Sequence, residues 1–260
     1  MSSFVKEGLE LLAERISEIN LLLNEAEAKQ EDARLYAALC RSIQVLSISH
    51  FEGYIKDLVK NILDDLNQSS SFKLSSNDLK FSYCRKFIVP LNDGKDNVSK
   101  IKDLILVFDE LDTKFDSAAF HKPNKNPKES ILNQIATSFG EKKIFKKLNN
   151  SDISNAFSNT DAENILLISE LKLKLQNAID DYPYIEDDTL LNINSTEVQD
   201  TFWETFIQEI LSERHKIAHG SMNNSTDHSS IRSNILKMEI LLISITYLLS
   251  IKGNPISEAN

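Results

Sequence analysis

The stretch S-E-R-H-K-I-A-H-G-S, from Ser212 to Ser221, places Arg214, His215 and His219 within about one and a half turns of an α-helix. Gly220 follows directly, and glycine is the residue that most often ends a helix. The apolar residues before this stretch recur every three or four positions, which is the spacing of one helical face. The stretch therefore predicts a helix that ends at Gly220 and carries three titratable side chains near its end.

The same spacing continues along the rest of the chain. Apolar stripes predict helices over residues 4–28, 32–66 and 161–179, and a final helix whose core positions run from Ile235 to Leu249. A capping box at residues 194–197 predicts that the motif helix begins near Thr196. Because we find no alternating strand pattern, we predict an all-α fold, an antiparallel helical bundle. The expected stripe of the motif helix is Val198, Phe202, Phe206, Ile210 and Ile217.

The middle of the chain, about residues 68–160, is less regular. It predicts a short helix capped by Ser76 or Asn77, a helical stretch over 101–111, and a helix over 127–139 that ends at Gly140. A loop is expected at 121–128, where proline, asparagine and lysine dominate. Since no clear linker flanks this region, we interpret residues 1–260 as a single helical domain with an inserted elaboration at about 68–160. A separate folded domain is the alternative.

Charge is unevenly distributed. The formal net charge of −10 argues against non-specific coating of nucleic acid by the whole surface. The segment from Lys114 to Lys147 holds eight lysines against three acids, a local balance of +5, so the remainder carries −15. The lysines of E-K-K-I-F-K-K-L, residues 141–148, form either a solvated helix face or a surface that follows an RNA strand.

Cys40 and Cys84 lie far apart and form no metal-binding spacing, so they are interpreted as buried packing groups. The N-terminus has no apolar signal core. The longest nearly apolar run, Ile240 to Ile251, spans 12 residues, whereas a membrane helix needs about 20. The sequence therefore predicts a soluble, cytoplasmic protein with no membrane partner.

An arginine and a histidine at this spacing suit phosphate chemistry. The guanidinium of Arg214 can bind phosphate oxygens through two hydrogen bonds, and imidazole is the side chain best suited to move protons near neutral pH. Cleavage of RNA by its own 2′-hydroxyl needs a phosphate clamp and two proton transfers. One chain offers a single His219 for the two proton transfers, whereas two copies of the motif in a dimer supply two such histidines. We expect no cofactor and no metal.

Two alternative chemistries find little support. His215 and His219 are spaced four residues apart, as in some zinc sites, but Lys216 stands where H-E-x-x-H has its glutamate. The phosphate-binding and nucleophile motifs G-x-x-x-x-G-K-[ST], G-x-G-x-x-G and G-x-S-x-G do not occur. The remaining histidines, His50, His121 and His228, have no companions at ligand spacing and are expected to be structural or exposed.

The segment R-H-K-I-A-H-G resembles the R-x4-H signature of the HEPN superfamily, in which a polar residue follows the arginine. The segment S-H-F-E-G-Y-I-K-D-L, from Ser49 to Leu58, resembles the long helix of its stand-alone prokaryotic branch, of the RiboL-PSP-HEPN type. R-x4-H alone is a weak pattern, but the two segments together are specific. The predicted helices that carry them cover about a quarter of the chain, and the segments lie in the expected order.

This resemblance implies an all-helical HEPN-like fold, homodimerisation through the motif helices, and metal-independent endoribonuclease activity on RNA as a toxin or phage-defence effector. It implies that Arg214 and His219 are catalytic and that His215 is the accessory polar residue. A neutralising antitoxin or a defence-system partner is expected with such a role. The alternative function is a non-catalytic helical module that binds a nucleotide, an RNA or a partner protein.

Glu52 is a further candidate for the catalytic site. It lies at the margin of the apolar stripe of the long helix, where its carboxylate can orient Arg214 or pair with a histidine, and Gly53 beside it lets another helix approach. The simpler interpretations are an ordinary boundary glutamate for Glu52, an ion pair with Glu209 or Glu213 for Arg214, and capping of free carbonyls for His219. His215 is equally well explained by solvent exposure.

Overall fold

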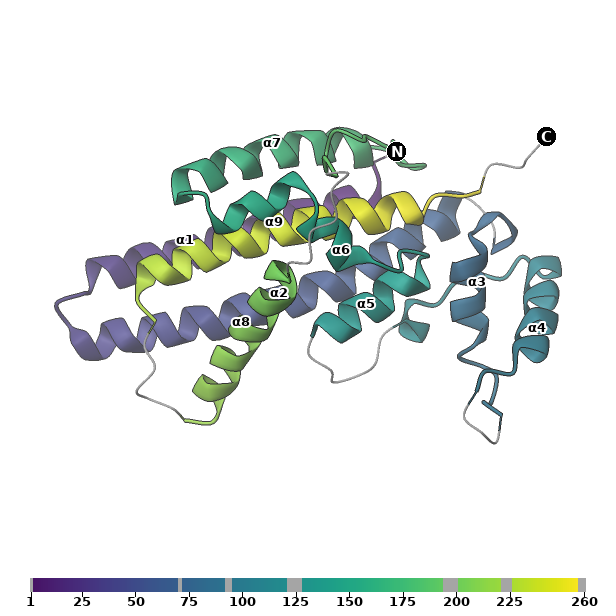
Figure 1. Ribbon diagram of the computed structural model, residues 1–260, viewed down its shortest axis with the longest axis horizontal. Coiled ribbons are helices and arrows are strands. Elements are labelled where there is room, and N and C mark those ends of the chain that lie inside the picture. The colour runs from purple at the N-terminus through teal and green to yellow at the C-terminus, as the bar shows by residue number, and fades with distance from the viewer. Residues whose placement is uncertain are drawn as a thin grey trace.

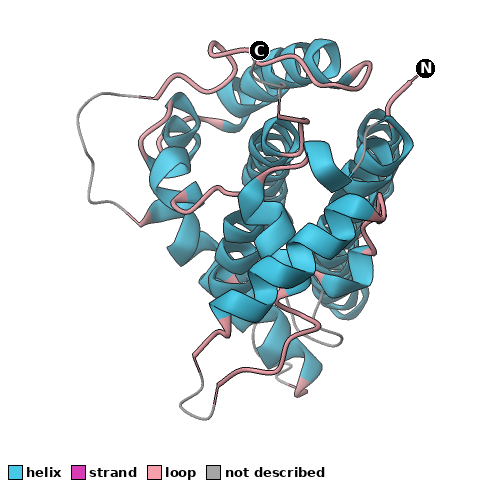
Figure 2. Cartoon of the chain, turned by 90° about the vertical axis from the view of Figure 1, so that its right-hand side faces the viewer, coloured by secondary structure: helices cyan, strands magenta, loops and turns pink. Residues whose placement is uncertain are grey.

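The computed structural model describes residues 2–69, 72–91, 95–120, 128–193, 201–220 and 226–256. Within these ranges the chain is helical, without a β-strand, and a single isolated bridge joins Ser151 to Ile193 (Figure 2). The predicted all-α fold is therefore confirmed. The α-helices are α1 (Phe4–Ala28), α2 (Ala33–Ser69), α3 (Asn77–Cys84), α4 (Val98–Glu110), α5 (Glu129–Ser138), α6 (Ile144–Asn149), α7 (Asp161–Ile179), α8 (Phe202–Ala218) and α9 (His228–Lys252). Three short 3-10 helices join them, η1 (Phe72–Leu74), η2 (Ser117–Ala119) and η3 (Asp152–Phe157).

The centre of the bundle is α9, which packs against α1, α2 and α7 (Figure 1). The run from Met238 to Ser250 is buried at every position, because a helix that is apolar on all sides must be surrounded by other helices. By length and composition alone α9 is suited to cross a membrane, but 78% of its most apolar window is buried inside the protein. That burial agrees with the predicted soluble bundle and makes α9 its core helix.

The helices α1, α2, α7 and α9 run along the long axis of the molecule, whereas α8 crosses it steeply (Figure 1). The first turn of α8 is held from outside the helix. Asn149, at the end of α6, accepts a hydrogen bond from the backbone N–H of Trp203 (3.2 Å) and donates one to Glu204 (2.7 Å). The prediction that the motif helix begins near Thr196 is wrong, because Thr201 is the N-cap of α8 and Phe202 is its first residue. The predicted capping box at 194–197 and Val198 lie outside the described residues.

The middle of the chain forms two groups of helices. The helices α3, α4 and η1 pack together at one end of the molecule around an aromatic cluster (Figure 1). The helices α5 and α6 pack against α8, and α5 also packs against α3, which joins the two groups. The predicted cap by Ser76 and the positive φ of Gly140 after α5 (+91°) are both observed, while the predicted loop residues 121–127 lie outside the description. The boundaries of the inserted elaboration remain a prediction. The cluster is formed by Phe72, Tyr83, Phe87, Phe108, Phe115 and Phe120.

A buried carboxylate joins three segments of the bundle. Asp65 of α2 accepts hydrogen bonds from the backbone N–H groups of Phe4 (2.9 Å) and Val5 (3.1 Å) at the start of α1. It also accepts one from the hydroxyl of Tyr184 (2.8 Å), which follows α7. Asp65 thereby satisfies backbone donors that the first turn of a helix leaves free.

We predict that Asp65→Ala lowers the free energy of unfolding by about 2–3 kcal/mol, because three buried donors lose a charged acceptor. Urea unfolding followed by circular dichroism measures the change. Asp64→Ala is the matched control, since it removes a neighbouring carboxylate of α2 that pairs with Lys60 of the same helix (3.1 Å). Equal stability of the two variants would show that Asp65 does not hold these segments together.

Candidate functional site

The motif helix ends where the sequence predicts. Ala218 is the last residue of α8, His219 is its C-cap, and the backbone N–H of His219 donates to the carbonyl of His215 (3.1 Å). Gly220 then adopts a positive φ of +83°, a conformation that glycine adopts without strain. The chain therefore turns away directly after His219 and leaves its ring at the C-terminal end of the helix.

The structure brings the two motif histidines together. Both His215 and His219 are exposed, and their ring centroids are 4.2 Å apart with an angle of 59° between the ring planes. This proximity follows from their four-residue spacing, which places side chains on the same helical face. Among the described residues no third histidine, cysteine or carboxylate joins them in a group suited to hold a metal ion.

Arg214 occupies a different environment. It is half-buried and follows the buried Ile210 and Leu211 by about one turn of α8. Its Nε atom is buried and has no hydrogen-bond partner. In the part of the chain that the structure covers, no ion pair joins Arg214 to Glu209 or Glu213, and no hydrogen bond joins it to either histidine of the motif. The arginine is thus held against the bundle while the histidines lie in solvent.

Glu52 lies at the margin of the buried face of α2, as predicted. It is half-buried, and its Oε1 atom is buried with no hydrogen-bond partner in the described chain. Neither Arg214 nor a histidine contacts this carboxylate through a hydrogen bond there, so a catalytic role for Glu52 remains a prediction. Gly53 accommodates a side chain of α1. The guanidinium of Arg15 lies 3.5 Å from the position that a Cβ at residue 53 would take, and it pairs with Asp57 (2.8 Å).

A small cavity of about 30 Å³ lies under α8, between α2 and α9. Its lining includes Glu213, which precedes the motif arginine, and Gln44, whose amide nitrogen is buried without a hydrogen-bond partner. Burial raises the pKa of the Glu213 carboxyl above its ordinary value, and the nearby Lys216 opposes this effect. Sequence analysis did not identify this cavity, because its residues come from three helices that are distant in sequence.

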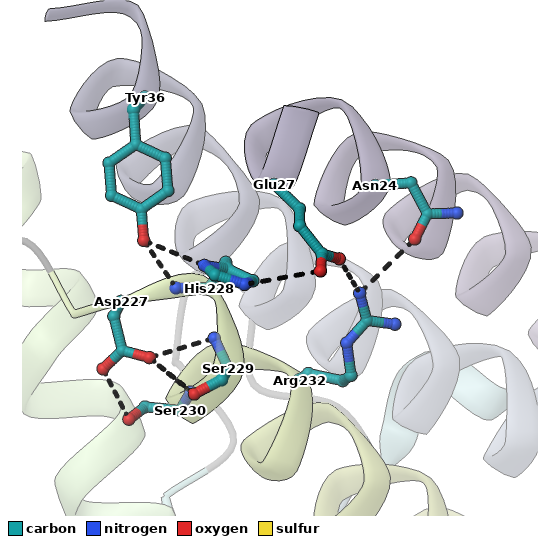
Figure 3. A network of polar contacts seen from close by, with 8 residues as sticks. All are labelled: Asn24, Glu27, Tyr36, Asp227, His228, Ser229, Ser230 and Arg232. Atoms are coloured by element: carbon teal, nitrogen blue, oxygen red, sulfur yellow. Dashed lines mark hydrogen bonds and ion pairs between the residues drawn. The ribbon is translucent and has the colours of Figure 1, made fainter. Parts of the chain in front are cut away.

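The connection after the motif ends on a polar network at the start of α9 (Figure 3). Asp227 caps α9 by accepting hydrogen bonds from the N–H groups of Ser229 and Ser230 (3.0 Å each). The hydroxyl of Tyr36 accepts a hydrogen bond from the His228 N–H and shares a second with its Nδ1 atom (both 3.0 Å). The start of α9 is therefore anchored to the beginning of α2.

The remaining candidates have structural positions. Cys40 and Cys84 are buried and free, and burial raises the pKa of the Cys84 thiol to about 11, which confirms them as packing groups. His50 pairs with Glu18 (3.1 Å), while His121 lies outside the description. In the lysine-rich segment 141–148, Lys147 pairs with the buried Glu141 (2.5 Å), whereas Lys142 and Lys143 are exposed.

We predict that Glu213→Gln stabilises the protein at pH 7.5 and that the difference disappears below about pH 4. The pKa of Glu213 is higher in the folded state than in the unfolded state. Protonated Glu213 therefore contributes fully to the stability of the fold below the unfolded-state pKa, and this contribution is lost as the pH rises through the folded-state pKa. Thermal unfolding at both pH values measures the effect. Glu209→Gln, which changes an exposed glutamate one turn earlier, is the control. A stabilisation of the same size at both pH values would contradict the prediction.

Comparison with known proteins identifies the family. The sequence model of the RiboL-PSP-HEPN family matches residues 10–250, a range that includes both α2 and α8. No curated protein and no solved structure matches the chain. HEPN domains are often ribonucleases, so the match points to a nuclease or RNA-binding role. It also confirms the resemblance carried by the motif segments, and the chain belongs to the RiboL-PSP-HEPN family.

Proposed function

We propose that this protein is a metal-independent endoribonuclease. The observation that carries the proposal is the exposed pair of His215 and His219 at the end of α8, with Arg214 next to it in sequence, in a chain of the RiboL-PSP-HEPN family. An exposed imidazole can reach a bound RNA strand without a rearrangement of the bundle. The positive φ of Gly220 sets where α8 ends, so both imidazole rings lie at a defined, solvent-accessible end of the helix.

The reaction breaks the bond between phosphorus and the 5′-oxygen of the next nucleotide. The 2′-hydroxyl loses its proton to a base and attacks the adjacent phosphorus, and the departing 5′-oxygen receives a proton. His219 carries one of these protons, His215 supports it as the accessory polar residue, and Arg214 balances the negative charge of the pentacovalent phosphorane. The products are a 2′,3′-cyclic phosphate and a 5′-hydroxyl end.

The active unit in this proposal is a homodimer. A twofold axis places two copies of one patch together, so the motifs of both protomers supply a base and an acid to one phosphate. An open groove beside Ile217 supports this arrangement, since it lies next to the motif and its lining is largely apolar. It is formed by Leu22, Ala38, Arg41, Ser42, Val45, Leu46, Ser49 and Ile217.

In the cell we propose that the enzyme acts on cytoplasmic RNA as a toxin or phage-defence effector. An unrestrained ribonuclease harms its own host, so we further propose a neutralising antitoxin or a defence-system partner. Inducible expression tests the toxic role, because the wild-type protein would arrest growth and His219→Ala would not.

We predict that the purified protein cleaves RNA in EDTA and leaves 2′,3′-cyclic phosphate and 5′-hydroxyl ends. His219→Ala and Arg214→Ala should each lower the cleavage rate by about 10²–10⁴-fold, because the first removes a proton carrier and the second a phosphate clamp. His50→Ala is the control, since it removes a histidine of α2 that pairs with Glu18 of α1 and does not belong to the motif. End-group analysis of the products and the initial cleavage rates provide the measurement.

Two results would overturn this proposal. Activity that chelation abolishes and added Mg²⁺ or Zn²⁺ restores would exclude the metal-independent mechanism. Binding of RNA without cleavage, at equal affinity in the wild type and both motif variants, would favour the non-catalytic binding module.

We predict that Val45→Asp converts the dimer into a monomer and lowers RNA cleavage at least tenfold, because it places a charge in the apolar groove next to the motif. Light scattering at the assay concentration measures the mass. Leu106→Asp is the control, because it introduces the same charge at an exposed leucine of α4, far from α8 (Figure 1). A monomeric protein with full activity would show that one chain holds the complete site.

A further inference from the structure

A second hollow reaches the motif from the other side of α8. A cleft of about 510 Å³ lies between the start of α5 and α8, and His215 is part of its lining. His219, the proposed proton carrier, does not line the cleft, but its ring centroid lies 4.2 Å from that of His215, which does. Its volume falls within the roughly 300–1,000 Å³ typical of sites that hold small ligands. The lining is formed by Lys128, Glu129, Ile207, Gln208, Leu211, Ser212 and His215.

The lining combines an apolar floor with polar groups of several kinds. Ile207 is fully buried and Leu211 is 9% exposed, so the aliphatic surface open at the base of the cleft comes chiefly from Leu211. Lys128 and Ser212 are exposed and supply an ammonium group and a hydroxyl. A simple anion would interact with the lysine but not with the apolar base of the cleft, and an apolar ligand would interact with the base but not with the lysine. A nucleotide matches both, because its base has flat faces and its phosphate is anionic.

A pair of side chains in the cleft is arranged to recognise a base edge. The amide nitrogen of Gln208 donates a hydrogen bond to one carboxylate oxygen of Glu129 (2.5 Å). This contact fixes the Gln208 amide and leaves the other Glu129 oxygen and the amide oxygen as acceptors. Acceptors of this kind pair with the exocyclic amino groups of bases, as glutamate does with cytosine. Uracil has no such amino group.

The charge of the cleft limits how the nucleotide is oriented. Glu129 repels a phosphate, whereas Lys128 and His215 attract one. The phosphate is therefore directed toward Lys128 and His215, and the base toward Gln208 and Glu129.

We infer that the cleft between α5 and α8 binds one nucleotide of the RNA strand, next to the phosphate that is cut, and prefers a base with an exocyclic amino group. The inference rests on the proposed ribonuclease function and adds a substrate subsite to it. Ile207 and Leu211 support the base, and Glu129 and Gln208 select it. Lys128 holds its phosphate.

Binding and sequence preference test the subsite separately. Binding is measured by fluorescence anisotropy with short RNA oligonucleotides and the His219→Ala protein, which keeps the strand intact. Adding Lys128→Ala should weaken binding severalfold. It should also reduce the slope of log affinity against log salt concentration by about 1, the value for one lost phosphate contact. Lys102→Ala, an exposed lysine of α4, is the matched control and should change neither.

Sequence preference is measured by sequencing the 5′-hydroxyl ends that the active protein produces. Wild-type protein should show a base preference at one position beside the cut, disfavouring uracil by about fivefold or more. Glu129→Gln and Gln208→Ala should each reduce that preference. Circular dichroism and thermal unfolding verify that these surface variants remain folded.

The outcomes distinguish the two proposals. If the protein cuts RNA, Lys128→Ala binds as Lys102→Ala does, and the cleavage positions are unchanged in Glu129→Gln, the subsite is wrong while the ribonuclease assignment stands. If the protein neither binds nor cuts RNA, both are wrong. Reduced binding in Lys128→Ala together with altered cleavage positions in Glu129→Gln supports the subsite.

Discussion

The burial of α9 is the constraint on which the rest of the structure depends. A helix that is apolar on every side cannot remain in water, and α1, α2 and α7 cover it with their own apolar stripes. Several of its buried polar side chains have partners, whereas the Ser250 hydroxyl has no hydrogen-bond partner among the described residues. Ser244 and Thr246 donate hydrogen bonds to carbonyls of the preceding turn, and Glu239 pairs with Lys172 of α7 (2.5 Å). The ion pair with α7 restrains the rotation of α9 in the bundle, whereas the Ser244 and Thr246 bonds lie within α9 itself.

The crossing of α8 explains why the motif is accessible. The first turn of α8 is tied to the bundle through Asn149, and its buried side packs on α2, whereas its last turn carries the exposed His215 and His219. Side chains placed on a packed helix are positioned more accurately than side chains on a loop. The bundle thus supplies a rigid base for the exposed histidines, and the network at Tyr36 and His228 anchors the chain on the far side of the turn.

The parts of the fold that could be predicted are those with local signals. The helices α1, α2 and α7 have continuous apolar stripes, and each was predicted to within about three residues of its observed ends. The predicted start of α8 was wrong because the prediction assigned the helix cap to residues 194–197. The hydrogen bonds to the first turn come instead from Asn149, more than fifty residues earlier in the chain. The end of α8 was predicted because Gly220 is a local signal. Contacts across helices, such as that of Arg15 with Gly53, leave no periodic trace.

The charge distribution sets a further limit on how the site can bind RNA. Of the lysines between residues 114 and 147, Lys147 is committed to Glu141, and Lys142 lies 4.0 Å from Asp78. The attraction at α8 therefore rests on a few cations, chiefly Lys128, Arg214 and Lys216, on a chain of net charge −10. Affinity for RNA rises with the number of phosphates that are neutralised. In the proposed ribonuclease a single protomer therefore engages a short length of strand. In the proposed dimer the second protomer doubles these cations, and it also doubles the net charge from −10 to −20.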